Sequence, residues 1–242
     1  GSFVINGDGD FVFTPDENFN GTMELSYEVT DGTTAVAASG SIDVAPVNDA
    51  PDVAAPVTGT VLEDNAITFT EAELLAHASD VEGDTLSVEN LTVTNGSFVI
   101  NGDGDFVFTP NTDFSGVMAL SFDVSDGTDS TPATGSITVT PDADAPILTV
   151  SSATGDEDTA IALDVAAALS DTDGSELLSD VTISGIPNGA VLSTSAGDLT
   201  PNPDGSVTVP LADLASLAIT PPENDSNNFQ LNVSVTSTDG AD

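Results

Sequence analysis

Alternating apolar and polar residues along the chain predict short β-strands. In Leu25, Tyr27 and Val29 every second residue is apolar, the period of a strand with one face in a core. Similar runs recur throughout the chain, separated by segments rich in Asp, Asn, Gly and Pro, which favour turns. Helical pattern is limited to single turns, one of them after Thr70, where Thr70 and Glu73 predict a capping box. The pattern therefore predicts an all-β protein.

A repeated string of fifteen residues organises the chain. It runs from Gly1 to Pro15 and returns unchanged from Gly96 to Pro110, at a spacing of 95 residues. In both copies two β-branched or aromatic runs flank an Asn-Gly-Asp-Gly-Asp turn, which predicts a β-hairpin. A third, diverged copy carries the later landmark Asp239-Gly240. A repeat of this length is a small domain, so we expect a tandem array.

The repeat divides the chain into three units: the C-terminal half of a repeat (residues 1–46), a complete repeat (47–141) and a third, diverged repeat lacking its last strand (142–242). Short proline-bracketed linkers, Pro46 to Pro51 and Pro141 to Pro146, are expected to be stiff. Both ends of the chain are expected to be cut from a longer protein.

The second unit indicates an antiparallel sandwich of immunoglobulin-like type, because short strands alternate with turn signals. Its expected strands cover residues 53–61, 67–69, 86–94, 98–100, 106–108, 117–124 and 137–140. The third unit should be a variant of this sandwich, with an added helical turn near Pro210 to Leu217. We expect such sandwiches to be joined end to end.

Charge restricts the possible partners. The 242 residues contain no Lys or Arg, 41 acidic residues and one His, for a net charge of −41. Phosphate binding needs clustered cations, so nucleic acid and anionic membranes are not expected as partners. Two carboxylates about 7 Å apart in water cost on the order of 0.6 kcal/mol, so cations must screen the chain. With no cysteine for disulfides, bound metal is the expected staple. The single histidine, His77, is interpreted as structural.

The acids concentrate in turns, and strand alternation assigns each turn to one end of its sandwich. We call the first linker with the loops that meet it the first junction, and the second linker with its loops the second junction. The predicted first-junction ligands are Asp16, Glu17, Asn48, Asp49, Asp80, Glu82, Asp84 and Asp126. The predicted second-junction ligands are Glu63, Asp64, Asp113, Asp142, Asp144, Asp171, Asp173 and Asp239.

Calcium (Ca2+) is the metal that these ligands favour. It takes six to eight oxygens and accepts all-protein cages, whereas magnesium keeps its waters and soft metals need sulfur or imidazole. The alternative is that the acids form turns and solvate the surface of a salt-adapted protein. Convergence from three segments favours calcium at the junctions. The turns at 6–10 and 101–105 lack a downstream bidentate Glu, and a plain hairpin turn is favoured there.

These motifs resemble the bacterial cadherin-like tandem repeats of giant secreted adhesins, including the RTX adhesins exported by type I secretion. The resemblance rests on residues 47–51, 63–64, 79–84, 106–110, 114–116 and 124–127. The third unit resembles a related adhesin repeat through residues 181–190, 211–214 and 220–222. The second linker departs from the pattern, with Asp142-Ala143-Asp144 where the first has Val47-Asn48-Asp49.

The resemblance implies tandem cadherin-like sandwiches that form a calcium-rigidified extender of a large extracellular adhesin or surface filament. Such a segment holds a distal binding domain away from the bacterial cell in adhesion or biofilm. Its expected partners are calcium ions, neighbouring repeats and other copies in a filament.

Two other classes of function rank lower. A carbohydrate- or surface-ligand-binding sandwich ranks second, since Tyr27 is the single tyrosine and tryptophan is absent. Catalysis ranks last, because paired carboxylates that suit a glycosidase are equally explained as metal ligands. No catalytic or cofactor-binding residue is predicted, and we expect the protein not to be an enzyme.

Overall fold

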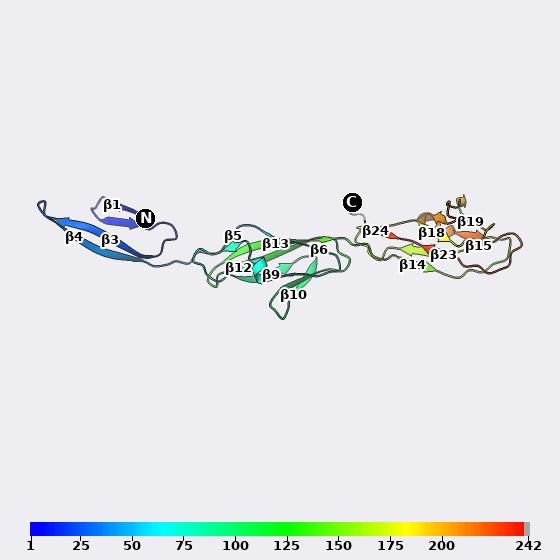
Figure 1. The fold of residues 1–242 in the computed structure, drawn as a ribbon, viewed down its shortest axis with the longest axis horizontal. Helices are drawn as coiled ribbons and strands as arrows, with labels where there is room; N and C mark the ends of the chain where they lie inside the picture. The colour runs from blue at the N-terminus through cyan, green and yellow to red at the C-terminus, as the bar shows by residue number, and fades with distance from the viewer. Residues whose placement is uncertain (240–242) are drawn as a thin grey trace.

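The computed structural model describes residues 1–239. Figure 1 shows three groups of strands following one another along one long axis. Residues 45–51 and 141–146, which connect the groups, contain no strand or helix. The prediction of an all-β chain of tandem β-sandwiches is confirmed. In the Asp239-Gly240 landmark, Gly240 lies outside the described residues.

The first unit contains two antiparallel pairs. Strand β1 (Ser2–Ile5) pairs with β2 (Phe11–Thr14), and β3 (Gly21–Thr30) pairs with β4 (Ala35–Val44). The predicted hairpin is confirmed. Its turn is held by the Asn6 side chain, whose Oδ1 accepts from the backbone N–H groups of Asp8 at 3.0 Å and Asp10 at 2.8 Å. These bonds explain why Asn begins the turn.

The second unit is a sandwich around one core. Its strands are β5 (Asp52–Val53), β6 (Val57–Leu62), β7 (Ile67–Phe69), β8 (Ala78–Ser79), β9 (Ser87–Val93), β10 (Gly96–Ile100), β11 (Phe106–Pro110), β12 (Gly116–Ser125) and β13 (Ser130–Thr140). One sheet has the order β6-β13-β12-β9 and another β10-β11-β7, while β5 pairs with β8. Phe108, Met118 and Ile137 are fully buried between them.

The helical turn of the second unit forms as predicted. Helix α1 (Glu71–Leu74) has Thr70 at its N-cap. The backbone N–H of Glu73 donates to Thr70 Oγ1 at 3.2 Å, and the N–H of Thr70 donates to Glu73 Oε2 at 2.8 Å. This reciprocal pair is the predicted capping box, and it lets Leu74 enter the core.

Two strand predictions for the second unit were wrong. The expected strand 53–61 is broken at Pro56, which has no N–H to donate. The last strand, β13, begins at Ser130 rather than near Ile137, even though it includes Pro132. Pro132 is tolerated because β6 pairs with β13 only from Gly135 onward. That pairing is also parallel, in a sandwich predicted to be antiparallel.

The third unit is more irregular. Its elements are β14 (Ile147–Val150), β15 (Ile161–Ala162), β16 (Val165–Ala168), β17 (Glu176–Leu178), β18 (Val181–Ser184), β19 (Val191–Thr194), β20 (Gly197–Asp198), β21 (Val207–Val209), the 3-10 helix η1 (Leu211–Ser216), β22 (Ala218–Thr220), β23 (Asn232–Ser234) and β24 (Ser237–Asp239). Sheets β15-β22-β19-β20 and β21-β18-β23 enclose its core, with β14-β16 and β17-β24 as separate pairs. The predicted turn after Pro210 forms as 3-10 helix.

Candidate metal centres at the junctions

The second junction contains a group of three carboxylates, Glu63, Asp171 and Asp173. One oxygen of each lies within 4.8 Å of the others. Glu63 directly follows β6, and the two aspartates lie in the loop between β16 and β17. Glu63 and Asp171 are only 3% and 1% exposed. Glu63 Oε1 accepts the backbone N–H of Asp142 at 2.5 Å, but its Oε2 is buried without a hydrogen-bond partner. An oxygen buried in this way is a natural position for a cation.

The pKa shifts within this group differ in direction between its members. Burial raises the pKa of Glu63, the N–H of Asp142 opposes the rise, and the charges of Asp171 and Asp173 add to it. Burial also acts on Asp173, but hydrogen bonds from Ser175 and Ser115 outweigh it and hold the Asp173 pKa below the usual carboxyl range. Burial therefore outweighs hydrogen bonding at Glu63, whereas hydrogen bonding outweighs burial at Asp173.

A second group, Asp64, Asp113 and Asp144, lies at the same junction and meets the same 4.8 Å limit. Asp64 and Asp113 have φ of 57° and 54°, in the left-handed region that Asp and Asn tolerate. The N–H of Asp113 donates to Asp64 Oδ1 at 3.2 Å. Burial, then the charge of Asp64, raises the pKa of Asp113. Asp144 is contributed by the linker, so this group joins the second unit to the linker.

Direct hydrogen bonds also cross the second junction. Asp173 Oδ2 accepts from the backbone N–H of Ser115 at 2.9 Å and from its hydroxyl at 2.7 Å. The hydroxyl of Ser170 donates to the linker carbonyl of Ala145 at 2.9 Å. The second unit, the linker and the third unit are thus in mutual contact.

Glu176 is a second-junction residue that the sequence reasoning missed. It is 4% exposed; its Oε1 accepts the backbone N–H of Asp144, and its Oε2 is buried without a hydrogen-bond partner. It begins β17 and pairs in register with Asp239 of β24. An available signal was its position close behind Asp173 in one acidic loop. Asp142 and Asp239 belong to neither carboxylate group, and their predicted role as ligands remains a prediction.

At the first junction a side-chain amide forms hydrogen bonds with two carboxylates. The Asn48 side-chain nitrogen donates to Asp126 Oδ2 at 2.9 Å and to Asp129 Oδ2 at 3.0 Å. The N–H of Asp129, then the Asn48 amide, lowers the pKa of Asp126. The sequence reasoning missed Asp129, which lies three residues beyond Asp126 in the same turn. These two carboxylates are compensated by hydrogen bonds.

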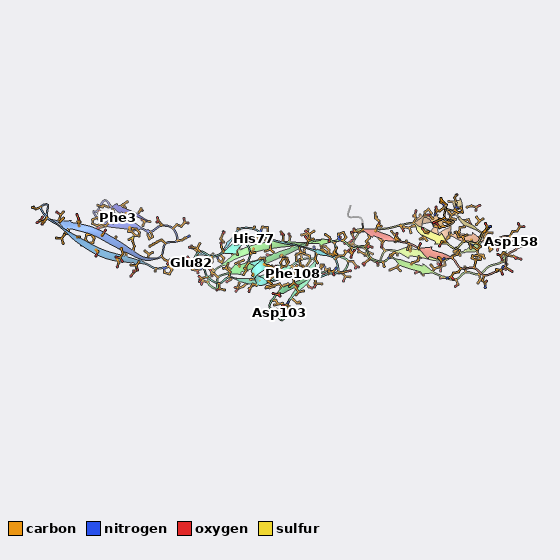
Figure 2. All side chains as sticks on the ribbon, viewed as in Figure 1. Phe3, His77, Glu82, Asp103, Phe108 and Asp158 are labelled. Atoms are coloured by element: carbon orange, nitrogen blue, oxygen red, sulfur yellow. The ribbon has the colours of Figure 1, made fainter. Side chains whose placement is uncertain are left out.

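The remaining predicted acids of the second unit at this junction lie in the loop between β8 and β9. The N–H of Asp49 donates to Glu82 Oε2 at 3.3 Å. Asp80 Oδ1 accepts the N–H of Asp84 at 2.9 Å, whereas Asp80 Oδ2 is buried without a partner. Figure 2 shows Glu82 at the end of the second unit that faces the first. Within residues 1–239, no group of three acids here meets the distance limit met at the second junction.

Among residues 1–239, no hydrogen bond joins Asp16 or Glu17 to the linker. Both are exposed, and Asp16 forms an ion pair with the amino group of Gly1 at 2.5 Å. Counting from Pro15 and Pro110 shows that the repeat equivalent of Asp113 is Asn18. Asn18 has the same left-handed conformation, with φ of 59°. The repeat register was the signal that could have identified it; ligation by Asp16 or Glu17 remains a prediction.

Most of the chain matches one known protein family. The family described as "Cadherin-like domain" matches residues 1–45 and 47–140. No match was found among curated proteins. Within residues 1–239, no helix has the length and apolar character needed to cross a membrane.

Three solved structures are similar at low identity. Extracellular domains 1–3 of mouse protocadherin-24 share 16% identity over 97% of this chain and 85% of theirs, with a TM-score of 0.46. Protocadherin gamma B7 extracellular cadherin domains 1–4 share 15% over 98% and 63%, with a TM-score of 0.47. An endo-fucoidan hydrolase of glycoside hydrolase family 107 shares 17% over 98% of this chain, which spans only 36% of the hydrolase, with a TM-score of 0.29. All three TM-scores lie below 0.5, so none of these likenesses establishes a function.

Proposed function

The chain belongs to the cadherin-like domain family, and from that premise we propose that it is a calcium-rigidified extender of a large extracellular bacterial adhesin or surface filament. Cadherin-like domains are typically extracellular modules of adhesion type and generally bind calcium. In this proposal the segment holds a distal binding domain away from the cell in adhesion or biofilm. Export by type I secretion, as for RTX adhesins, belongs to the same proposal.

One observation supports the proposal above the others: the buried, unpartnered Oε2 of Glu63 beside Asp171 and Asp173. Leaving a buried acceptor without a donor or cation costs about 1–3 kcal/mol, and more when the group is charged. The donor set consists of carboxylate oxygens, which suit a hard cation such as calcium. The residues present therefore fit the metal that the family generally binds.

Two carboxylate groups would hold the metal at the second junction. Glu63, Asp171 and Asp173 form one, and Asp64, Asp113 and Asp144 the other. Bound calcium supplies positive charge that offsets the repulsion among these acids. Each ion would also be a common ligand partner for several of them. Because the acids come from the second unit, the linker and the third unit, shared ligation would oppose bending between them.

The size of the effect follows from linkage. A ligand that binds only the assembled junction stabilises it by about 2.7 kcal/mol when present at a hundredfold excess over Kd. Calcium-rich extracellular fluid would therefore favour the extended form. We propose as partners calcium ions, the neighbouring units 1–46, 47–141 and 142–242, and other copies in a filament.

A second candidate, a carbohydrate-binding module, is favoured by one cleft in the third unit. This cleft of about 980 Å³ is lined in part by Asn227, Asn228, Phe229 and Gln230. Amide side chains beside a partly exposed aromatic ring suit a sugar. Binding on a glycan array that is lost in Phe229→Ala would support this candidate; an array without signal would remove it.

The proposed function is tested by calorimetric titration of residues 1–242 with calcium in moderate salt. Saturable binding that magnesium does not compete away is expected. Asp64→Asn should weaken it tenfold or more, whereas Asp158→Asn should not. Asp158 is a matched control at the far end of the third unit (Figure 2): its φ is 58° and it accepts the Asn224 N–H at 2.9 Å. Absence of saturable binding, or equal effects of both variants, would contradict the proposal.

A further inference from the structure

Strand β10 is an open edge of the second unit. It pairs in register with β11, and among residues 1–239 it pairs with no other strand. Just beyond its end, the N–H of Asn101 donates to the carbonyl of Asp105 at 2.9 Å. Hydrogen-bonded and non-hydrogen-bonded pairs alternate in an antiparallel ladder, so the backbone N–H and C=O groups of Phe98 and Ile100 point away from β11. They point toward the open edge.

This strand lacks the features that protect an edge from pairing. Its sequence, Gly-Ser-Phe-Val-Ile, contains no charge and no proline, and its register with β11 has no shift. Val99 and Ile100 are 63% and 59% exposed. By contrast, the edge strand β9 carries Glu89 and shifts its register with β12 around Asn90, whose φ is 51°. Charges and bulges oppose edge-to-edge pairing, so β9 is protected and β10 is not.

The exposed residues of this edge are identical in both copies of the fifteen-residue string, where Val99 and Ile100 recur as Val4 and Ile5. In the strand that follows the string, buried residues are kept and exposed ones change. The kept pair is Met23 and Met118, and the changed pairs are Thr22 and Val117, and Glu24 and Ala119. Core packing explains the kept methionine but not the identity of two exposed residues. A contact made by the exposed edge accounts for it.

The edge is self-complementary about a two-fold axis. When two β10 strands lie antiparallel with their Val99 residues opposite each other, Phe98 of each strand faces Ile100 of the other. The outward N–H and C=O groups of these two residues then meet in reciprocal hydrogen bonds. The two Val99 side chains form a non-hydrogen-bonded pair, with Cβ atoms about 4.5–5.5 Å apart. The acidic turns that contain Asp103 fall at opposite ends of the pair.

The hairpin is also accessible to a second copy. Figure 1 shows β10 projecting sideways from the long axis of the chain, and Figure 2 shows Asp103 at the tip of this projection. Two copies with a net charge of −41 each repel one another through their acids. The uncharged β10 edge lets them meet with the acidic turns held apart.

From these observations we propose that β10 is a lateral contact, at which a second copy of this chain pairs strand to strand and joins two β10-β11-β7 sheets into one. The contact goes beyond the proposed function, because it uses a surface outside both junctions and needs no calcium. Salt of any kind screens the repulsion between copies, so pairing strengthens as monovalent salt rises.

Sedimentation of residues 1–242 over a range of protein concentrations, in sodium chloride with chelator, measures this pairing. The double variant Val4→Glu and Val99→Glu puts a charge on the edge in both copies of the string. Like charges directly opposite each other destabilise a strand pair, so dimerisation should require a severalfold higher concentration. The matched control is Thr22→Glu and Val117→Glu, which adds the same charge at exposed positions of β3 and β12. Circular dichroism would verify that each variant folds.

Disulfide cross-linking tests the register. The chain has no cysteine, so Val99→Cys introduces a single thiol. Two such thiols would lie opposite each other in a non-hydrogen-bonded pair, close enough for a disulfide. Oxidation should therefore give a covalent dimer. Val117, which is 53% exposed, provides the control Val117→Cys, and this variant should cross-link severalfold more slowly.

The outcomes are decisive for the lateral contact alone. A monomer at every protein and salt concentration would overturn the proposal, and so would equal weakening by the edge and control variants. Equal cross-linking of the two cysteine variants would also overturn it. Association that requires calcium and does not respond to sodium chloride would assign the contact to bridged acids instead. Calcium binding at the junctions is tested separately by the titration, so either proposal can fail without the other.

Discussion

At the second junction burial outweighs the one hydrogen bond that Glu63 accepts, whereas at the first an amide lies between two acids. Asn48 donates to two carboxylates at the first junction, while its repeat equivalent is Ala143 at the second. Glu63 and Glu176 at the second junction each keep one buried oxygen without a partner. Among residues 1–239 the first junction has one such oxygen, Asp80 Oδ2, so the two junctions differ in the linker side chain and in the number of buried oxygens without a partner. The side chain at this linker position therefore decides whether an amide can donate to the acids around it.

The largest effect is expected from a substitution in the core of the second unit, which contributes residues to both junctions. Phe108 is fully buried, with its ring 5.9 Å from that of Phe69. Phe108→Ala should destabilise the second unit by about 3–5 kcal/mol, because it leaves a cavity. Phe13 has the same place in the identical first string but is only half-buried, so Phe13→Ala is the matched control and should cost much less. Denaturant unfolding measures both; equal losses would contradict the account.

Glu63→Gln should act in opposite directions with and without calcium. With calcium it removes a ligand and should weaken binding about tenfold or more. With chelator it removes an uncompensated buried charge and should raise thermal stability. Glu157, the exposed repeat equivalent of Glu63 in the third unit, provides the control Glu157→Gln. If Glu63→Gln destabilises the protein in chelator, the oxygen is compensated in a way that the account lacks.

Asn48→Ala should loosen the first junction by about 1 kcal/mol in chelator, since two hydrogen bonds to carboxylates disappear. The second junction should not change. Thr22→Ala removes another hydrogen bond to a carboxylate, the 2.6 Å bond to Asp43, but within one unit. Hydrogen exchange of the linker amides measures the difference. Equal protection in Asn48→Ala and Thr22→Ala would refute the role of the amide.

The smallest expected effect is a pH dependence that separates the junctions in chelator. The Glu63 pKa is raised from its ordinary 4.5, so its contribution favours the folded state below that value and is lost as pH rises through the raised pKa. Lowering the pH from neutrality toward 5 should therefore stabilise the second junction.

Asp126 responds in the opposite sense. Its pKa is lowered from 3.8, so the stability it contributes is lost only as pH falls below that value through the lowered pKa. The first junction should not change between pH 7 and 5. Spin-label distances recorded across both junctions at the two pH values check this, and a matching response at the first junction would contradict it.

The identical strings show what sequence can and cannot predict. Both form the predicted hairpin, because turn chemistry is local. Yet Phe11 is 71% exposed while its equivalent Phe106 is 6% exposed. Phe106 pairs with Phe69 of β7, which lies outside the string, so its burial is a non-local property. Strand pattern therefore predicted the hairpin, whereas the burial of its rings depends on β7, which has no counterpart among residues 1–46.

The candidate site was also predictable from the sequence only in part. Strand alternation brought Glu63, Asp64 and Asp113 to the end of the second unit that meets the third, where the structure has them together with linker and third-unit acids. It did not identify Glu176, which reads as the start of an apolar strand, or Asp129, whose role depends on the position of the Asn48 amide. Such contacts depend on side-chain placement across three segments, which periodicity does not encode.

Thermal unfolding of residues 1–242 tests the central claim most directly, with calcium, with excess chelator and with magnesium at one moderate salt concentration. The account predicts that chelation lowers the melting temperature by several degrees, as expected for a loss of about 2.7 kcal/mol, and that magnesium does not restore it. An unchanged melting temperature would contradict it and leave the acids as the surface of a salt-adapted protein.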